Sequence, residues 1–114
     1  MSSNIQVVGD IVVIKVSGDL LGEDAGLDLY NSINVYNTNQ SYKKFILDLS
    51  EARYINSQGL GVLITSYTHV KNKEGVLVLL NPNESVKKLL NITKLNSVFQ
   101  IFNSLNEAET ALNK

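Results

Sequence analysis

Apolar positions along the chain follow two spacings, one typical of β-strands and the other of helices. Near the start, two β-branched runs, Ile5 to Val8 and Ile11 to Val16, flank the dipeptide Gly9-Asp10. Alternating apolar runs around such a dipeptide predict a β-hairpin with a tight turn. Gly18 is expected to end the second strand, since glycine is depleted in strand interiors.

Beyond the hairpin, helical and strand patterns alternate. A first helix is predicted from about Glu23 to Thr38, and a second from Ser57 to a close between Lys71 and Gly75, because apolar residues recur there at helical spacing. Continuous apolar runs predict further strands, and two shorter helical patterns follow. The strands are Lys44 to Leu49, Val76 to Leu80 and Val98 to Phe102, and the helices are Glu84 to Asn91 and a terminal one with Leu105, Ala108, Ala111 and Leu112 facing inward.

The resulting order, ββαβαβαβα, predicts an α/β fold with flanking helices. Strands that alternate with helices form a mostly parallel central sheet, and the opening hairpin adds an antiparallel edge strand. The run from Lys44 to Leu49 is apolar on both faces, as in a central strand covered on both sides. No linker or repeat interrupts the pattern, so one domain is expected over residues 1–114.

Composition and charge exclude several classes of function. The chain has no cysteine and a single histidine, so a disulfide, a thiolate metal site or a zinc site of several histidines is not expected. Ten basic and eleven acidic residues are scattered, which does not supply the basic stripe that nucleic acids require. No apolar run approaches the roughly 20 residues of a membrane span, and no signal peptide is recognised, so a cytoplasmic location without membrane insertion is expected.

The junction between the Lys44 to Leu49 strand and the second helix is the main candidate site. It lies at the carboxyl end of a strand, where ligands and partners of α/β sheets usually bind. Asn56 or Ser57 could cap the helix, an interaction of about 1 kcal/mol. Gly59 and Gly61 could be small so that the helix lies close to the sheet. On these grounds alone, capping and packing compete with a functional interpretation of the segment.

The junction also resembles a known signature. "YINSQGLGVLI" resembles the D-S-[ST]-G-L-G motif of the STAS domain, found in anti-sigma factor antagonists of bacterial sporulation and stress pathways and in sulfate transporter tails. The resemblance extends to "GDL" at Gly18 to Leu20, to "ILDLSEARYI" before the motif and to "VLLNPNESVKKLLNITKLNSVFQIFNSLNEAETAL" after it. It therefore covers essentially the whole chain and implies the STAS fold.

The resemblance implies a regulatory binding module without a cofactor. Its partner would be an anti-sigma factor that is also a serine kinase, and binding would release the sigma factor. Ser57 corresponds to the serine that this partner phosphorylates, and a phosphatase would reverse the modification. The partner-binding surface implied by the motif comprises Asn56, Ser57, Gln58, Gly59, Leu60 and Gly61. Asn96 and Ser97 are expected from the topology to flank it.

Two residues depart from the family motif and keep alternatives open. Asn56 stands in place of the aspartate, and Gln58 in place of the following serine or threonine. Asparagine keeps the capping geometry but loses the charge. One alternative is a constitutive scaffold or transporter-associated subunit, such as a stressosome component or the STAS partner of a lipid-transport ATPase. The other is a nucleotide-binding STAS domain with a pocket lined by the Gly59 to Gly61 segment.

No enzymatic constellation emerges from the sequence. Ser57 and His69 are twelve residues apart on one predicted helix, roughly 18 Å along its axis, so they cannot form a triad with Asp48. Ile55 occupies the first glycine position of a nucleophile elbow. His69 and the pairs Lys43-Lys44 and Lys87-Lys88 are expected to be solvent-exposed. A metal site at the acidic residues is conceivable, but helix-dipole complementation and solubility explain them better; they are Asp19, Glu23, Asp24 and Asp28.

Overall fold

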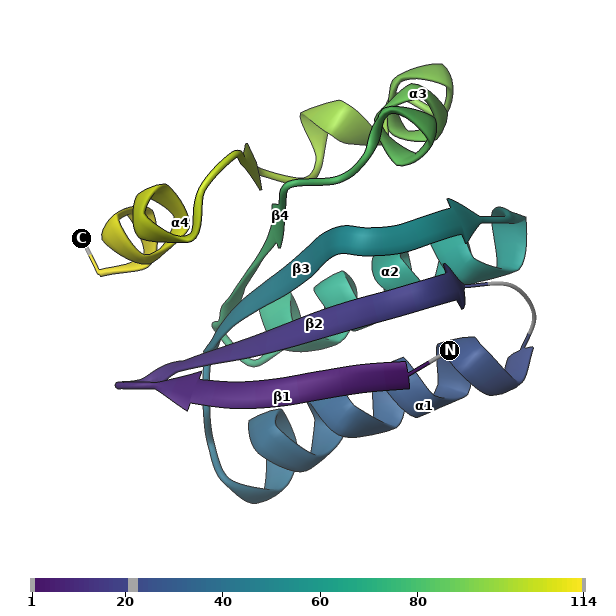
Figure 1. The fold of residues 1–114 in the computed structure, drawn as a ribbon. Helices are drawn as coiled ribbons and strands as arrows, with labels where there is room; N and C mark the ends of the chain where they lie inside the picture. The colour runs from purple at the N-terminus through teal and green to yellow at the C-terminus, as the bar shows by residue number, and fades with distance from the viewer. Residues whose placement is uncertain (1, 21–22, 114) are drawn as a thin grey trace.

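The computed structural model describes residues 2–20 and 23–113, which form one five-stranded sheet with helices on both faces (Figure 1). The strands lie in chain order. The first pair is antiparallel and the others are parallel, which confirms the predicted mostly parallel sheet with an antiparallel edge. Their bounds are β1 (Ser2–Val8), β2 (Ile11–Leu20), β3 (Lys44–Ile55), β4 (Val76–Leu80) and β5 (Ile101–Phe102).

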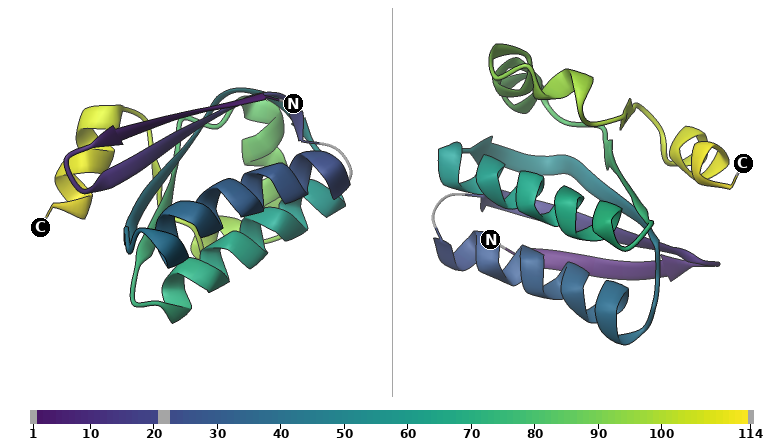
Figure 2. Two further views of the ribbon diagram at one scale, coloured as in Figure 1. Left: turned by 90° about the horizontal axis from the view of Figure 1, so that it is seen from below. Right: turned by 180° about the vertical axis from the view of Figure 1, so that it is seen from behind.

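Helices α1 and α2 lie side by side on one face of the sheet, and α4 covers part of the other face (Figure 2). The helix α1 continues into a short π-helix, and a 3₁₀ turn lies between α3 and β5. The bounds are α1 (Glu23–Asn34), the π-helix (Val35–Asn39), α2 (Ser57–Asn72), α3 (Glu84–Ile92), the 3₁₀ turn (Leu95–Ser97) and α4 (Leu105–Leu112).

The core is divided by the sheet into two layers, as the strand patterns require. Val12 and Ile14 of β2 face the layer beneath α1 and α2, whereas Ile11 and Val13 face α4. Successive strand residues point to opposite faces, so a strand covered on both sides is apolar at every position. The continuous apolar run of β3 has this cause, and the prediction that this strand is central is confirmed.

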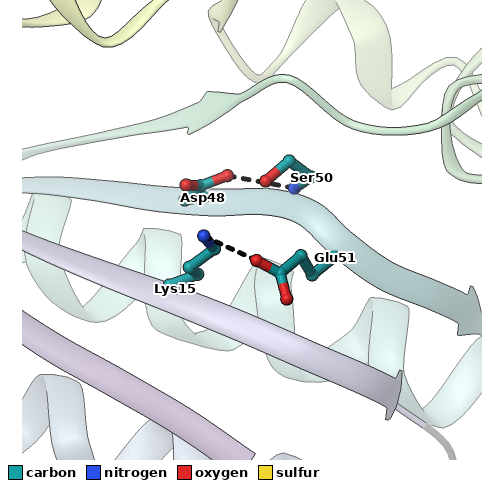
Figure 3. A network of polar contacts seen from close by, with 4 residues as sticks. All are labelled: Lys15, Asp48, Ser50 and Glu51. Atoms are coloured by element: carbon teal, nitrogen blue, oxygen red, sulfur yellow. Dashed lines mark hydrogen bonds and ion pairs between the residues drawn. The ribbon is translucent and has the colours of Figure 1, made fainter.

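Strand β3 is longer than predicted and carries extra residues relative to β2. The register runs from Lys15 opposite Asp48 to Ser17 opposite Glu51, so β3 has one additional residue there. The Asp48 carboxylate accepts a hydrogen bond from the Ser50 backbone N–H at 3.0 Å, and Lys15 forms an ion pair with Glu51 at 2.6 Å (Figure 3). The hydrogen bond donated to Glu51 raises the pKa of Lys15. These contacts stabilise a β-bulge, which bends the strand beyond it.

A second irregularity follows, between Gly18 opposite Ala52 and the next pair of the ladder. Asn83, at the start of α3, donates hydrogen bonds to backbone carbonyl groups of β3 in this region. Its side-chain N–H groups donate to the carbonyl oxygens of Ala52 at 2.8 Å and Arg53 at 3.2 Å. Its side-chain oxygen accepts from the Val86 N–H at 2.9 Å and so caps α3. One side chain therefore joins the end of β3 to a helix thirty residues later.

Several predicted details are wrong. Gly18 does not end β2, which continues to Leu20 with Gly18 at a positive φ of 84° beside the irregular register. The last strand has two residues, because Val98 has helical backbone angles and is 43% exposed. Leu105 is also exposed, whereas Ala108 and Leu112 face the core as predicted.

Within residues 2–20 and 23–113, no helix combines the length and the apolar character needed to cross a membrane.

Replacement of Asn83 by alanine should lower the free energy of unfolding by about 2 kcal/mol. The change removes a helix cap and the two hydrogen bonds that the side chain donates to β3. Ser104→Ala is the matched control, because Ser104 caps α4 without contacting β3, and about 1 kcal/mol is expected for it. Urea unfolding of both variants measures the difference, and equal losses would show that the contacts to β3 contribute nothing.

Candidate functional site

Asn56 connects the end of β3 to α2 and caps that helix. Its backbone is extended, with φ −99° and ψ −176°, and its side-chain oxygen accepts from the Gly59 N–H at 2.9 Å. Its carbonyl oxygen accepts from the Leu60 N–H, also at 2.9 Å. The cap is therefore Asn56 and not Ser57, which is the first residue of the helix. Of the two residues proposed for capping, the structure selects the first.

Ser57 is exposed, and no hydrogen bond in the described part of the chain uses its hydroxyl group. Gln58 beside it is also exposed. By contrast, Gly59 is buried, and Leu60 is only 6% exposed and belongs to the core beneath α2. The predicted site therefore combines two accessible polar side chains with two residues that attach the helix to the sheet.

Gly61 lies one turn after Ser57 and has no packing reason to be glycine. A Cβ atom built on Gly61 would meet no atom within 4 Å, so the interpretation that Gly61 brings α2 close to the sheet is wrong. Residues four and seven positions after Ser57 lie on the same helical face, and Ile64 at the second of these is 39% exposed. Ser57, Gly61 and Ile64 thus form an open face of α2, called here the Ser57 face.

The Ser57 face begins at the positive end of a helix dipole. The first turn of α2 contains no acidic residue. The N–H groups of a first helical turn and the helix dipole favour negative charge in this position. The site is therefore electrostatically suited to an added anionic group on Ser57.

His69 is half-buried and does not serve Ser57, and the prediction that it is an exposed residue is wrong. Its ring nitrogens lie 3.5 Å from the Tyr30 hydroxyl and 3.2 Å from the Thr38 hydroxyl. The rings of Tyr30 and His69 meet edge to face, with centroids 5.6 Å apart. His69 therefore links α2 to α1 and the π-helix. Both Ser57 and His69 lie in α2, about 18 Å apart along its axis, so a catalytic pair is excluded.

Other predicted contributors lie away from the Ser57 face. Ser97 lines a cavity with Tyr67 and Lys71 near the far end of α2, so the expectation that it flanks Ser57 is wrong. That cavity and two others bounded by described residues are not lined by Gly59 to Gly61, so they give no support to a nucleotide pocket there.

Charged groups proposed from the sequence have structural partners or lie on the surface. Lys44 pairs with Asp10 at 2.9 Å, and this contact lowers the pKa of Asp10. Lys87 lies 3.7 Å from Glu84 on α3. The side chains of Asp19, Glu23 and Asp24 lie outside the described part of the chain, and Asp28 is exposed. Within the described residues, no group of three histidine, aspartate or glutamate side chains could hold a metal ion.

Substitutions of Asn56 should separate the effect of the capping hydrogen bond from the effect of a negative charge at the same position. Asn56→Ala is expected to lose about 1 kcal/mol of stability, because the Gly59 N–H loses its acceptor. Asn56→Asp keeps an acceptor and adds a negative charge at the helix start, which should gain roughly 0.5 kcal/mol at low salt. Urea unfolding at two salt concentrations tests both, and an aspartate variant as unstable as the alanine variant would contradict this assignment.

Gly61→Ala should stabilise the fold by up to about 1 kcal/mol. Alanine restricts the unfolded chain and favours the helix, and its methyl group meets no neighbouring atom here. Gly75→Ala is the opposing control, because a Cβ atom there would lie 2.6 Å from the Lys43 carbonyl oxygen and should destabilise the protein. Thermal unfolding should show a raised melting temperature for Gly61→Ala and a lowered one for Gly75→Ala. A destabilised Gly61→Ala variant would refute the open-face assignment.

Comparison with known proteins agrees with this architecture. Residues 2–108 match the family model of the STAS domain. A protein of Thermotoga neapolitana, named as a candidate anti-sigma factor antagonist, is 31% identical over 103 residues, which cover 90% of each chain.

The fold also matches two solved structures of the anti-sigma factor antagonist SpoIIAA, both 19% identical to this chain. The unphosphorylated form has a TM-score of 0.86 and aligns over 98% of this chain and 96% of its own. The phosphorylated form, from Bacillus, has a TM-score of 0.77 and aligns over 96% of this chain and 98% of its own. With a family match over nearly all of its length, the chain belongs to the STAS domain family and is of the kind found in anti-sigma factor antagonists.

Proposed function

We propose that this protein is a phosphorylation-controlled antagonist that binds an anti-sigma factor with serine kinase activity through the Ser57 face. The observation that carries the proposal is the division of roles between two adjacent residues. Asn56 caps α2, and Ser57 is left exposed without a structural hydrogen bond in the described chain. Ser57 is therefore accessible to a kinase, and its modification does not remove the cap.

The unmodified Ser57 face is suited to close contact with a partner. Gly61 has no side chain, so a partner can approach the backbone of α2 one turn after Ser57. Ile64, a further turn along, offers an exposed apolar side chain beside the small residues. An apolar contact next to a small-residue surface is compatible with a dry, tightly packed interface centre. Binding in this form would hold the anti-sigma factor and release the sigma factor.

A phosphate on Ser57 should preserve the fold and disrupt the interface. It adds a charge of about −1.5 to −2 at a helix N-terminus, where the dipole and free N–H groups favour an anion. In the bound state the same charge would be buried against the partner. An unpaired buried charge costs several kcal/mol, and about 1.4 kcal/mol corresponds to tenfold in affinity. The phosphate therefore acts as a switch on binding, and a phosphatase resets it.

The names of similar proteins support this proposal. The Thermotoga neapolitana relative is named as a candidate anti-sigma factor antagonist, and SpoIIAA has been solved both with and without phosphate. The local departures from the motif, Asn56 and Gln58, favour a second candidate function in which the same face binds a partner constitutively. In that case the protein is a scaffold or transporter-associated subunit without phosphorylation.

Two mutations of Ser57 should distinguish the effect of adding a negative charge from the effect of losing the hydroxyl group. Ser57→Asp is expected to weaken binding to the co-purified anti-sigma factor by two or more decades, as about 3 kcal/mol of uncompensated charge implies. Ser57→Ala is the control and should bind within about threefold of the wild type, because it removes no charge and no structural contact. Calorimetric titration of the purified partner measures both. A Ser57→Asp variant that binds as tightly as the wild type would contradict the switch.

Gly61→Ala tests the close approach at the same face. The variant should be at least as stable as the wild type yet bind the partner roughly tenfold more weakly, because one methyl group would occupy a tightly packed contact. Thr68→Ala changes an exposed residue near the other end of α2 and should leave binding unchanged. Unaltered binding of the Gly61→Ala variant would place the interface elsewhere.

A further inference from the structure

Strand β1 is an end strand of the sheet, and its outer edge has no neighbouring strand in the described part of the chain (Figure 1). It pairs with β2 alone, over seven residues and without a shift in register. Outside that ladder, no backbone hydrogen bond between described residues involves residues 2–8. An unpaired strand edge carries a row of N–H and C=O groups that can pair with another strand.

The turn of the hairpin determines which backbone groups of β1 lie on the free edge. Gly9 has a positive φ of 64° and forms a two-residue loop with Asp10, so that Val8 lies opposite Ile11. The two residues that flank such a loop exchange both backbone hydrogen bonds, and bonded and non-bonded pairs then alternate along the ladder. Val8 and every second residue before it are therefore bonded to β2. The residues between them direct their N–H and C=O groups outward, and they are Ser3, Ile5 and Val7.

This edge is accessible and lacks the features that usually keep edge strands apart. Val7 is 40% exposed, and Asn4 and Gln6 are exposed as well. Natural edge strands are commonly protected by a lysine, a proline or a β-bulge. The sequence of β1, SSNIQVV, contains no charged residue and no proline, and its register with β2 contains no bulge. A regular, uncharged strand edge is therefore open to a further strand.

We propose that β1 pairs antiparallel with β1 of a second copy of this chain, so that the two sheets join into one. An antiparallel pair of identical strands has a two-fold axis, and the same surface is used by both copies. With Ile5 on the axis, its N–H and C=O exchange two hydrogen bonds with Ile5 of the second copy. Ser3 of each copy then forms the next bonded pair with Val7 of the other. All the outward-directed backbone groups of residues 3–7 are paired in this register.

The side chains of β1 suit its own copy as the occupant of the edge. In this register Asn4 lies opposite Gln6 of the second copy, where side chains of an antiparallel pair are closest. Two side-chain amides both donate and accept hydrogen bonds, so they are complementary. A charged residue near the axis would instead lie close to the same charge, and β1 has none. Ile5 packs against the core beneath α1 and α2, and its counterpart would continue that apolar layer across the axis.

The expected dimer is reversible, because a single pair of strands buries less than the roughly 800 Å² per partner of a standard interface. The net charge of −1 leaves little long-range repulsion between two copies. None of the residues of the Ser57 face belongs to β1. The edge is therefore a second interaction surface, which is separate from the proposed switch.

Sedimentation of the intact protein from micromolar to millimolar concentration should show a reversible equilibrium between monomer and dimer. Two double variants test the register. Asn4→Glu with Gln6→Lys places opposite charges across the axis and should dimerise at least as tightly as the wild type. Asn4→Glu with Gln6→Glu places like charges there and should weaken dimerisation roughly tenfold, as expected for two unfavourable cross-strand pairs. Both residues are exposed, so neither variant should unfold.

Amide hydrogen exchange measured by NMR on the ¹⁵N-labelled protein tests the strand pairing itself. A higher protein concentration should slow the exchange of the Ile5 and Val7 amides, because these pair only with the second copy. The Gln6 and Val8 amides are bonded to β2 in the monomer, so their exchange should change much less. The Ser57 amide is the control outside the strand and should exchange at the same rate at every concentration.

Three outcomes would overturn the proposal. The protein could stay monomeric at millimolar concentration, the like-charge variant could dimerise as tightly as the opposite-charge variant, or the concentration-dependent protection could lie outside β1. Each would show that β1 does not pair with its own copy in this register. None of these results depends on a phosphate on Ser57 or on an anti-sigma factor, so the two proposals fail or succeed separately.

Discussion

The position of Ser57 depends on how the bulged end of β3 is held. Beyond Asp48 this strand still pairs with β2, but the register shifts twice along the ladder. Asn83 ties this segment to α3 by donating to two carbonyl groups of β3 while capping α3. Asn56, directly after β3, then caps the start of α2. These two amide side chains thus help to set the direction of the chain into α2 and the placement of Ser57 at its start.

In the proposed function, this arrangement separates stability from regulation within a single turn of helix. The fold depends on Asn56 and on the burial of Leu60, whereas Ser57 contributes little to it. A residue with no structural task can be modified without unfolding the domain, and a helix N-terminus accepts the added charge. Gly61 also leaves space on the outside of the helix, because glycine has no side chain. The proposed switch therefore rests on adjacent residues with different roles, a structural one for Asn56 and a regulatory one for Ser57.

Much of the fold was predictable from local patterns, because the hairpin, the alternation and the central apolar strand are each determined over short stretches. The bulges of β3 were not, since they depend on Lys15, Glu51 and Asn83 meeting across elements that are distant in sequence. The short β5 and the exposed Leu105 have the same origin, because apolar character alone does not tell which side chains find a neighbour. At the site, the motif pointed to a segment that the structure places at the start of α2. The structure was needed to show that Asn56 rather than Ser57 caps the helix. It was also needed to show that Gly61 faces open space.

The central claim, that Ser57 carries a regulatory phosphate, is tested most directly by the intact mass of the protein isolated from its native cells. The measurement compares growing with stressed cells, for the wild type and the Ser57→Ala variant. The account predicts a mass increase of one phosphate that changes with condition and is absent from the variant. A wild-type protein without phosphate in every condition would contradict it and would favour a constitutive partner at the same face.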